Sequence, residues 1–271
     1  MIDATTLPSF RDHWVQHPQG RLFTRRWQPS GHPPHGNPIV LLHDSLGCVA
    51  LWRDFPAALC QATGREVIAY DRLGFGRSDA RDALPSLDFV AEEARDFFPR
   101  VCEQLGVDGF VVLGHSVGGG MAIQCAANEV GRCEALVTLA AQIFPEDRTL
   151  EGIRIARMQF HEAAQIERLA KYHGDKARWV LDAWTEIWLH PGFASWSMVD
   201  VLPRVRCPVL AIHGEQDEYG STRHPQLIGQ HSGGPVRIEI LSGVGHMPQR
   251  EQPQTVVELV SAAINTQRRR V

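Results

Sequence analysis

A serine at position 116 lies in the pattern G-H-S-V-G, which spans residues 114–118. The pattern follows an apolar run at residues 110–113 and precedes a segment with the composition of a helix. On a sharp turn from a strand to a helix, a serine has a strained backbone, and glycines on either side relieve the crowding. Such a turn raises the hydroxyl above the carboxyl ends of the strands, where α/β sheets bind ligands. The spacing therefore predicts that Ser116 is a nucleophile.

Two later segments carry groups that could activate this hydroxyl. His246 lies in the run G-V-G-H-M-P. Three acids lie close together after an earlier apolar run, namely Glu215, Asp217 and Glu218. A neutral imidazole can accept the proton of a serine that attacks a carbonyl, and a carboxylate on the second ring nitrogen stabilises the resulting imidazolium. These residue types support acyl transfer, although spacing alone does not separate the three acids.

The elements that must position these residues follow from alternating patterns along the chain. Aromatic and apolar residues flank a Pro/Gly turn within residues 9–28, which predicts an antiparallel hairpin. Short apolar runs indicate strands buried on both faces, and they lie at residues 38–42, 66–70, 110–113, 135–139, 208–212 and 236–241. Amphipathic segments predict helices near residues 50–62, 87–105, 117–130, 223–231 and 252–266. We expect an α/β fold with a mostly parallel sheet of about eight strands flanked by helices.

Residues 144–200 interrupt this alternation because they contain no convincing strand. They have a helical composition and carry four of the seven tryptophans, Trp179, Trp184, Trp188 and Trp196. We expect a helical cap inserted after the sixth strand, with residues 1–143 and 201–271 forming the core. The tryptophans either line a pocket beneath this cap or attach the cap to the core.

The order of a serine, an acid and a histidine, each after a strand, resembles the α/β-hydrolase superfamily. The resemblance covers almost the whole chain. It implies that Ser116 is the nucleophile and that His246, in a G-x-G-H block, is the base. Gly214 and Asp217 match the family's G-x-x-D pattern, which favours Asp217 over its two neighbours as the acid that orients the base.

Two further blocks resemble the family. The block H-D-S-L-G at residues 43–47 implies an oxyanion hole formed by the backbone amides of Ser45 and Val117. Asp44 stands where the family usually has glycine, so this loop departs from the common pattern. The block D-R-L-G-F-G-R-S-D at residues 71–79 resembles a structural turn of the family. It does not match a dinucleotide-binding fingerprint, because an acid replaces the third glycine.

The resemblance to cap-bearing members implies hydrolysis of a small carboxylic ester, lactone or enol-lactone through an acyl-enzyme, with no cofactor. The H-x-S-L-G block is closer to enol-lactonases. Two alternatives stay open, which are a C–C hydrolase of a meta-cleavage-type diketone and a ligand receptor with slow or no turnover. The substrate pocket is expected to include His115, Trp184, Trp188 and Met247.

Composition argues against several other classes of protein. The net charge of −4 offers no electrostatic surplus to a nucleic acid. The six cysteines form no C-x-x-C pair, and no His/Cys cluster has zinc spacing, so we expect buried thiols and no metal site. The chain shows neither a secretory signal nor an apolar run of membrane-spanning length, which predicts a cytoplasmic protein. His224 is expected in a loop, and the oligomeric state is left open.

Overall fold

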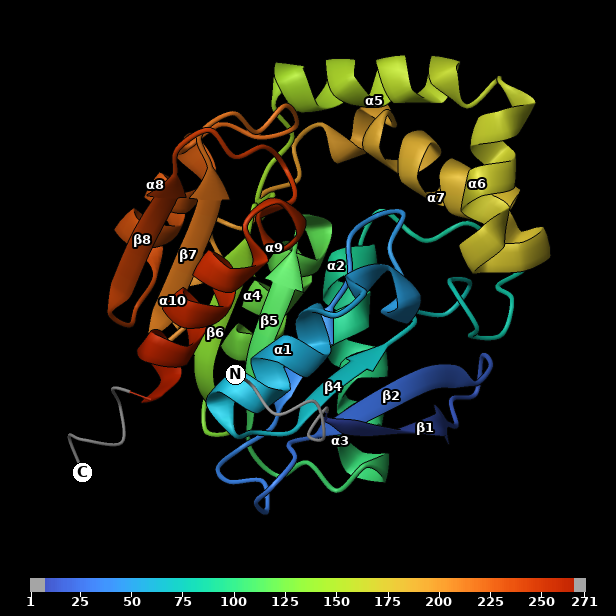
Figure 1. The fold of residues 1–271 in the computed structure, drawn as a ribbon. Coiled ribbons are helices and arrows are strands. Elements are labelled where there is room, and N and C mark those ends of the chain that lie inside the picture. Colours follow the sequence, from blue (N-terminus) through green and yellow to red (C-terminus); the bar gives the residue numbers. More distant parts are fainter. Residues whose placement is uncertain (1–7, 266–271) are drawn as a thin grey trace.

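Eight strands form a single sheet in the computed structural model, which describes residues 8–265 (Figure 1). The sheet order is β1-β2-β4-β3-β5-β6-β7-β8. The strands are β1 (Ser9–Val15), β2 (Leu22–Gln28), β3 (Ile39–Leu42), β4 (Val67–Tyr70), β5 (Phe110–His115), β6 (Cys133–Leu139), β7 (Val209–Gly214) and β8 (Val236–Leu241). Strands β3 to β8 run parallel, whereas β2 is antiparallel to both β1 and β4. The predicted fold class is therefore confirmed.

Alternate residues of the central strands reach opposite faces of the sheet. In β3, Ile39 and Leu41 pack into one core cluster, whereas Val40 and Leu42 pack into the other. All four side chains are buried. Because strand side chains alternate in direction, a strand that is apolar at every position must be covered on both faces.

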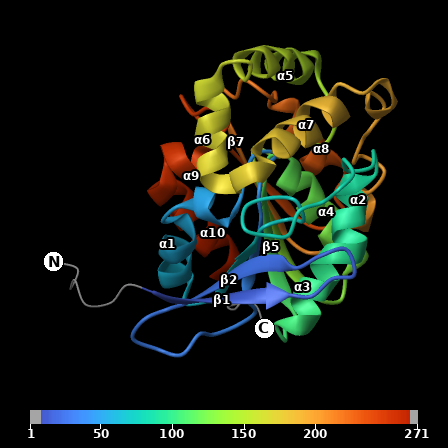
Figure 2. The same cartoon turned by 90° about the vertical axis from the view of Figure 1, so that its right-hand side faces the viewer.

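Helices provide this cover on both faces (Figure 2). Helices α1, α9 and α10 lie on one face, and α2, α3, α4 and α8 lie on the other. Their bounds are α1 (Phe55–Thr63), α2 (Phe89–Glu92), α3 (Phe98–Gln104), α4 (Val117–Asn128), α8 (Arg223–His231), α9 (Pro248–Glu251) and α10 (Pro253–Asn265), and a short 3-10 helix η1 (Val49–Trp52) precedes α1. This arrangement leaves the carboxyl ends of the parallel strands open to one end of the molecule.

The segment expected to be helical near residues 87–105 is divided in the structure. A π-helical turn, η2 (Glu93–Phe97), separates α2 from α3, and Pro99 lies in the first turn of α3. Proline has no amide hydrogen, so it cannot donate to the carbonyl group four residues earlier, which favours a wider turn at this point. An amphipathic pattern alone does not reveal this interruption.

An insertion of helices follows β6 and lies above the arrowhead of β5 (Figure 1). Its first turn is capped by Glu146 and Thr149, whose side chains exchange hydrogen bonds with each other's backbone amides. The helices are α5 (Asp147–Gln159), α6 (Ala163–His173), η3 (Gly174–Lys176), α7 (Ala177–Trp188) and η4 (Pro191–Phe193), and η5 (Leu202–Arg204) leads back to β7. The helical insertion after the sixth strand is confirmed. The limits 144–200 for this cap, between core segments 1–143 and 201–271, stay a prediction.

Four further expectations concern His224, the cysteines, membrane-spanning helices and a secretory signal. His224 lies in the first turn of α8 with its side chain buried, and not in a loop as expected. All six cysteines are buried and unbridged. No helix within residues 8–265 is both long and apolar enough to cross a membrane. The expected lack of a secretory signal depends on the first residues of the chain, and residues 1–7 lie outside the described part.

Candidate active site

Ser116 joins β5 to α4 in a strained backbone conformation. Its φ of 56° and ψ of −124° lie in a region that residues other than glycine rarely adopt. The chain closes tightly around it, because a Cβ atom on Gly114 would lie 2.0 Å from the carbonyl oxygen of Gly118. A Cβ atom on Gly118 would lie 2.2 Å from the carbonyl oxygen of Leu42. The two glycines of the motif thus have a steric cause, and the turn sets the serine at the N-terminus of α4, where negative charge is favoured.

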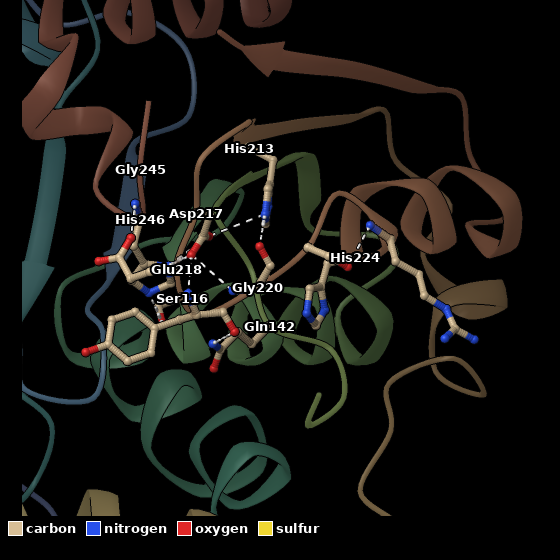
Figure 3. Close-up of polar contacts among 12 residues, drawn as sticks. Ser116, Gln142, His213, Asp217, Glu218, Gly220, His224, Gly245 and His246 are labelled. Carbon is tan, nitrogen blue, oxygen red and sulfur yellow. Dashed lines mark hydrogen bonds and ion pairs between the residues drawn. The ribbon is translucent and has the colours of Figure 1, made fainter. Parts of the chain in front are cut away.

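The structure brings the side chains of Ser116, His246 and Asp217 together (Figure 3). Nε2 of His246 lies 3.0 Å from Oγ of Ser116, and Nδ1 lies 2.9 Å from each carboxylate oxygen of Asp217. Because an ionised carboxylate only accepts hydrogen bonds, Nδ1 carries the ring proton and donates it to Asp217. Nε2 is then left to accept the serine hydroxyl, which is the arrangement that a base requires.

The other two acids near Asp217 have different partners. Glu215 accepts a hydrogen bond from the hydroxyl of Ser242 at 2.7 Å. Glu218 is exposed and accepts from the backbone amide of His246 at 3.3 Å. Of the three acids, Asp217 is the one whose carboxylate contacts the imidazole ring.

Asp217 is held in its ionised form by its surroundings. Its Oδ1 accepts from the amides of Tyr219 and Gly220 at 2.8 and 3.0 Å, and Nε2 of His213 lies 3.3 Å from Oδ2. Burial raises the pKa of Asp217, but the hydrogen bond and charge of His246 outweigh burial and leave the pKa below its usual value. The carboxylate therefore stays charged and can stabilise a protonated imidazole.

His246 is correspondingly a stronger base than a free histidine. Burial lowers its pKa, but the hydrogen bond and charge of Asp217 outweigh that effect, with smaller contributions from the charges of Glu218 and Asp44. The net result is a pKa above the usual value for histidine. A base with a pKa near the working pH is well matched to accepting a serine proton.

Two carboxylates fix the loop that carries His246. The amides of Gly245 and Met247 donate to the two oxygens of Glu251 at 2.8 and 3.1 Å. The amide between them, that of His246, donates to Glu218. Three successive amides are thus paired with acids, which restricts where the imidazole can point.

The two amides expected to bind an oxyanion are unpaired. Ser45 and Ser116 line the same cavity, and Val117 is the first residue of α4. Within residues 8–265, neither the amide of Ser45 nor that of Val117 donates to a protein group. Unpaired amides beside a nucleophilic hydroxyl are suited to binding a developing oxyanion.

His43 orders the loop that carries the first of these amides. Its Nδ1 donates to the carbonyl oxygen of Asp44 at 2.8 Å, and its Nε2 accepts from the amide of Arg72 at 3.1 Å. Burial lowers the pKa of His43 well below its usual value, so the ring stays neutral, as this pair of bonds requires.

Asp44, which replaces the family's usual glycine, faces the residue that precedes Ser116. Its Oδ1 lies 3.9 Å from Nδ1 of His115, whose Nε2 donates to the carbonyl oxygen of His246 at 2.8 Å. Burial raises the pKa of Asp44, but the neighbouring His115 ring outweighs burial and holds the pKa well below its usual range. The aspartate thus connects the loop of Ser45, through His115, to the loop that carries His246.

A cavity of about 270 Å³ opens beside Ser116 and His246. Trp184 and Met247 line it, as the sequence led us to expect. The cavity receives polar groups from the loop after β7 and from the segment after β6, together with apolar groups from α5 and α7. A small organic molecule with a carbonyl group would fit beside the serine.

The other two expected pocket residues do not line this cavity. His115 is buried behind Ser116, where it bonds to the backbone of His246. Trp188 is 1% exposed and packs edge-on against Phe193 and Trp196, with ring centroids 5.2 and 5.8 Å apart. Because Trp188 belongs to the main core cluster, it attaches the cap to the core and does not face the cavity.

Several residues that were not expected in the pocket also line the cavity, among them Leu46, Gln142, Ile153 and Tyr219. The amide nitrogen of Gln142 donates to the carbonyl oxygen of Tyr219 at 3.3 Å, and the Tyr219 ring lies 5.0 Å from that of His246. Tyr219 follows Asp217 by two residues, so its nearness to the acid was a usable signal. Gln142 and Ile153 belong to no motif.

Comparison with known proteins identifies the family of this chain. The family model described as alpha/beta hydrolase fold matches residues 37–186. A segment of 113 residues, 40% of this chain, is 37% identical to 31% of the human 1-acylglycerol-3-phosphate O-acyltransferase ABHD5. The crystal structure of proline iminopeptidase from Mycobacterium smegmatis has a TM-score of 0.71 at 23% identity and covers 94% of this chain and 98% of that one. The enol-lactonase from Burkholderia xenovorans LB400 has a TM-score of 0.70 at 17% identity, covering 93% and 100%.

These similarities differ in what they establish. At identities under 25%, the two solved structures show a shared fold. The segment shared with the human protein spans about a third of that protein's length. The family model, however, covers more than half of this chain and includes the turn at Ser116. The chain therefore belongs to the alpha/beta hydrolase fold family.

Proposed function

We propose that this protein is a serine hydrolase that cleaves a small carboxylic ester, lactone or enol-lactone through an acyl-enzyme intermediate. The observation that carries the proposal is the continuous contact from Oγ of Ser116, through the ring of His246, to the carboxylate of Asp217. A serine hydroxyl is a weak nucleophile at neutral pH, and a hydrogen-bonded base overcomes that weakness.

In the first half of the reaction, Ser116 attacks the carbonyl carbon while Nε2 of His246 takes its proton. The negative oxygen of the tetrahedral intermediate binds the amides of Ser45 and Val117. His246 then returns the proton to the leaving alcohol or enol oxygen, and the acyl group stays on Ser116. Asp217 stabilises the imidazolium in both transition states.

In the second half, a water molecule takes the place of the leaving group. His246 removes its proton as it attacks the acyl-enzyme, and the same two amides bind the second oxyanion. Collapse of this intermediate returns the proton to Ser116 and releases the carboxylic acid. These reaction steps balance without a cofactor, because His246 returns each proton that it removes.

The dimensions and lining of the cavity support a small substrate. A volume of about 270 Å³, with Trp184 and Tyr219 in its walls, suits a compact acyl group with an apolar or aromatic portion. The shared fold with an enol-lactonase supports the lactone among the proposed substrates. We assign the walls beyond the core to a cap formed by residues 144–200.

Turnover of p-nitrophenyl acetate tests this proposal. Wild-type protein should give a burst of p-nitrophenol equal to the enzyme concentration, and Ser116→Ala should give none. Ser195→Ala, at an exposed serine of the cap, is the matched control and should behave as wild type. A C–C hydrolase would instead favour a dienol-type diketone over aryl esters, and a receptor would bind ligand tightly without turnover. Either result would overturn the proposed ester chemistry.

A further inference from the structure

His173, the last residue of α6 in the cap, contacts two core loops at once. Its Nδ1 accepts the amide hydrogen of Gly76 at 2.8 Å, so the ring proton must lie on Nε2. That Nε2 donates to the carbonyl oxygen of Leu46 at 3.0 Å. His173 is 2% exposed, so the bond to Gly76 is buried and the bond to Leu46 is partly buried. Each of these backbone groups would be costly to leave unpaired in such a place.

The two loops joined by His173 have different places in the site. Leu46 directly follows Ser45, whose amide lies in the proposed oxyanion hole. Gly76 lies in the turn at residues 71–79, where the carboxylate of Asp71 accepts from the amide of Arg77 within the turn and from the amide of Val49 outside it. A single neutral ring therefore spans the cap, the loop of the oxyanion hole and a rigid turn of the core.

Further contacts fix the cap on this turn. Nζ of Lys176 donates to the carbonyl oxygens of Gly76 and Ser78 at 2.8 and 2.5 Å. The ring of Phe75 packs edge-on against Trp179, with centroids 5.5 Å apart. A Cβ atom on Gly74 would lie 2.3 Å from the Trp179 ring, so the absence of a side chain there is what allows this approach. These polar and apolar contacts together fix the position of the cap on the turn.

The loop of the oxyanion hole shares the apolar core of the cap. Leu46 packs against a buried cluster that includes Phe75 of the turn and Val180 and Leu181 of α7. Movement of the cap would therefore remove both the hydrogen bond to the Leu46 carbonyl group and the apolar contacts of its side chain. The Ser45 amide lies in one peptide plane with the Asp44 carbonyl group, which His43 and Arg72 hold from the core. The bond from His173 to Leu46 holds the next residue of the same loop from the side of the cap.

We propose that His173 is a positioning residue, which acts from the cap docked on the turn at residues 71–79 and, together with the core contacts of His43, holds the loop that carries the Ser45 amide. This inference rests on the proposed function, because it assigns the Ser45 amide to the oxyanion. It adds that the cap is part of the machinery that stabilises the transition state, in addition to forming a wall of the pocket.

The two hydrogen bonds of His173 require a neutral ring, because a proton on Nδ1 would face the amide hydrogen of Gly76. Burial is the largest influence and lowers the pKa of His173 to about 4. The charged groups that act on it are Lys176 and Arg72, which oppose protonation, and Asp44, which favours it. The ring is thus neutral at the pH where a serine hydrolase works.

Three variants test the inference with p-nitrophenyl acetate. His173→Phe keeps the ring contact with Phe75 but loses both hydrogen bonds, and kcat should fall between about 10- and 100-fold with KM changed less than about 2-fold. His173→Gln can accept at its carbonyl oxygen and donate from its amide nitrogen, and should recover most of the loss. His161→Phe, at an exposed histidine between α5 and α6, is the control and should match wild type.

A second readout separates positioning from a general loss of structure. Phenylboronic acid forms a tetrahedral adduct on serine that places an oxygen in the oxyanion hole. Its affinity should fall by the same factor as kcat in His173→Phe and return in His173→Gln. If the Phe variant does not fold, His173→Asn provides the same comparison, because its shorter amide can reach Gly76 but not Leu46.

Two outcomes overturn the inference alone. One is a folded His173→Phe protein with unchanged kcat and boronate affinity. The other is a loss in His173→Phe that lies wholly in KM. Wild-type protein that neither hydrolyses the ester nor binds the boronate would overturn the proposed function, and this inference with it.

Discussion

Asp217 has the most demanding position of any side chain in the site, because it must stay ionised while buried. Two backbone amides and His213 surround it on the side away from His246, and they leave its carboxylate oriented toward the ring. Its charge raises the pKa of His246 and fixes the proton on Nδ1. The place of the proton on Nδ1 can be tested by a substitution, and the raised pKa of His246 by the pH dependence of activity.

Replacing Asp217 with asparagine should keep the shape of the site while reversing the hydrogen bond. The amide of asparagine can donate to Nδ1, which would leave the proton on Nε2 and prevent it from accepting the serine proton. We expect kcat to fall by about 10⁴-fold, the typical cost of the wrong tautomer in such an arrangement. Steady-state kinetics on p-nitrophenyl acetate would measure it. Glu215→Gln, at an exposed acid bonded to Ser242, is the control, and an equal loss there would contradict the assignment.

The pH dependence of kcat/KM should report the same interaction. His246 must be neutral to accept a proton, so activity is lost as pH falls through its pKa in the free enzyme. Because the pKa of His246 is raised by Asp217, the midpoint of the acid limb should lie above 6.5. Asp217→Asn removes the carboxylate that raises the pKa of His246. The acid limb of its residual kcat/KM should therefore have a lower midpoint. A wild-type midpoint well below 6.5 would contradict the proposed pairing.

At the scale of elements, the junction of β5 and α4 is packed so closely that it leaves no room for a side chain at Gly118. The backbone of α4 touches that of β3, because Gly118 has no side chain at their point of contact. The same closeness sets Ser116 against the loop that follows β3, where Ser45 lies. Helix packing and the geometry of the oxyanion hole thus depend on one glycine.

Gly118→Ala should therefore disrupt both folding and activity. Its Cβ atom would lie 2.2 Å from the carbonyl oxygen of Leu42, and neither backbone can move without displacing a strand. We expect the free energy of unfolding to fall by about 3 kcal/mol, measured by urea denaturation. Gly131→Ala is the matched control, since nothing lies within 4 Å of its added Cβ, and it should change by less than about 0.5 kcal/mol. Equal stability of the two variants would show that α4 can shift freely.

At the scale of the whole molecule, an ion pair between a buried arginine and a partly exposed glutamate joins distant parts of the sheet. Arg65, before β4, is 1% exposed and donates to both oxygens of Glu134 in β6, at 2.6 and 2.9 Å. It also donates to the carbonyl oxygen of Asn37, before β3. These contacts lie at the end of the sheet opposite the cap, so they bear on stability and not on chemistry.

Glu134→Gln should leave the Arg65 charge buried without a matching charge. We expect the free energy of unfolding to fall by about 2 kcal/mol, because Arg65 stays buried without a matching charge while the partial exposure of Glu134 reduces the cost. Glu151→Gln, which breaks an exposed pair with Arg154, should cost less than about 1 kcal/mol. Urea denaturation of both variants checks the difference. Similar values would mean that water reaches the Arg65 pair as readily as the surface pair.

Sequence patterns predicted the sheet and Ser116, because both have local signals, whereas the choice of Asp217 among three acids came from the resemblance to a family. Runs such as residues 110–113 are short and apolar at every position, which is typical of a strand covered on both faces. The glycines around Ser116 are required by close backbone contact. The division of the helix before Pro99 had a local signal too, in the missing amide of proline. These features could be predicted without coordinates.

The walls of the cavity could not be predicted in the same way. Trp184 and Trp188 lie four residues apart on α7, yet Trp184 faces the cavity and Trp188 is buried against Phe193. Which of them faces the ligand depends on how α7 is rotated over the core, and that rotation is set by contacts between distant segments. His173 was missed for the same reason, since its two partners lie 97 and 127 residues earlier in the chain.

The central claim is that Ser116 carries the acyl group, and mass spectrometry of the protein after treatment with an organophosphonate tests it most directly. Peptide mapping should find one phosphonyl group per chain, on Ser116, with labelling strongly slowed in Asp217→Asn. Adducts spread over several serines, or no adduct on a folded protein, would contradict the account. Labelling of Ser116 at the same rate in Asp217→Asn would contradict the role assigned to the acid.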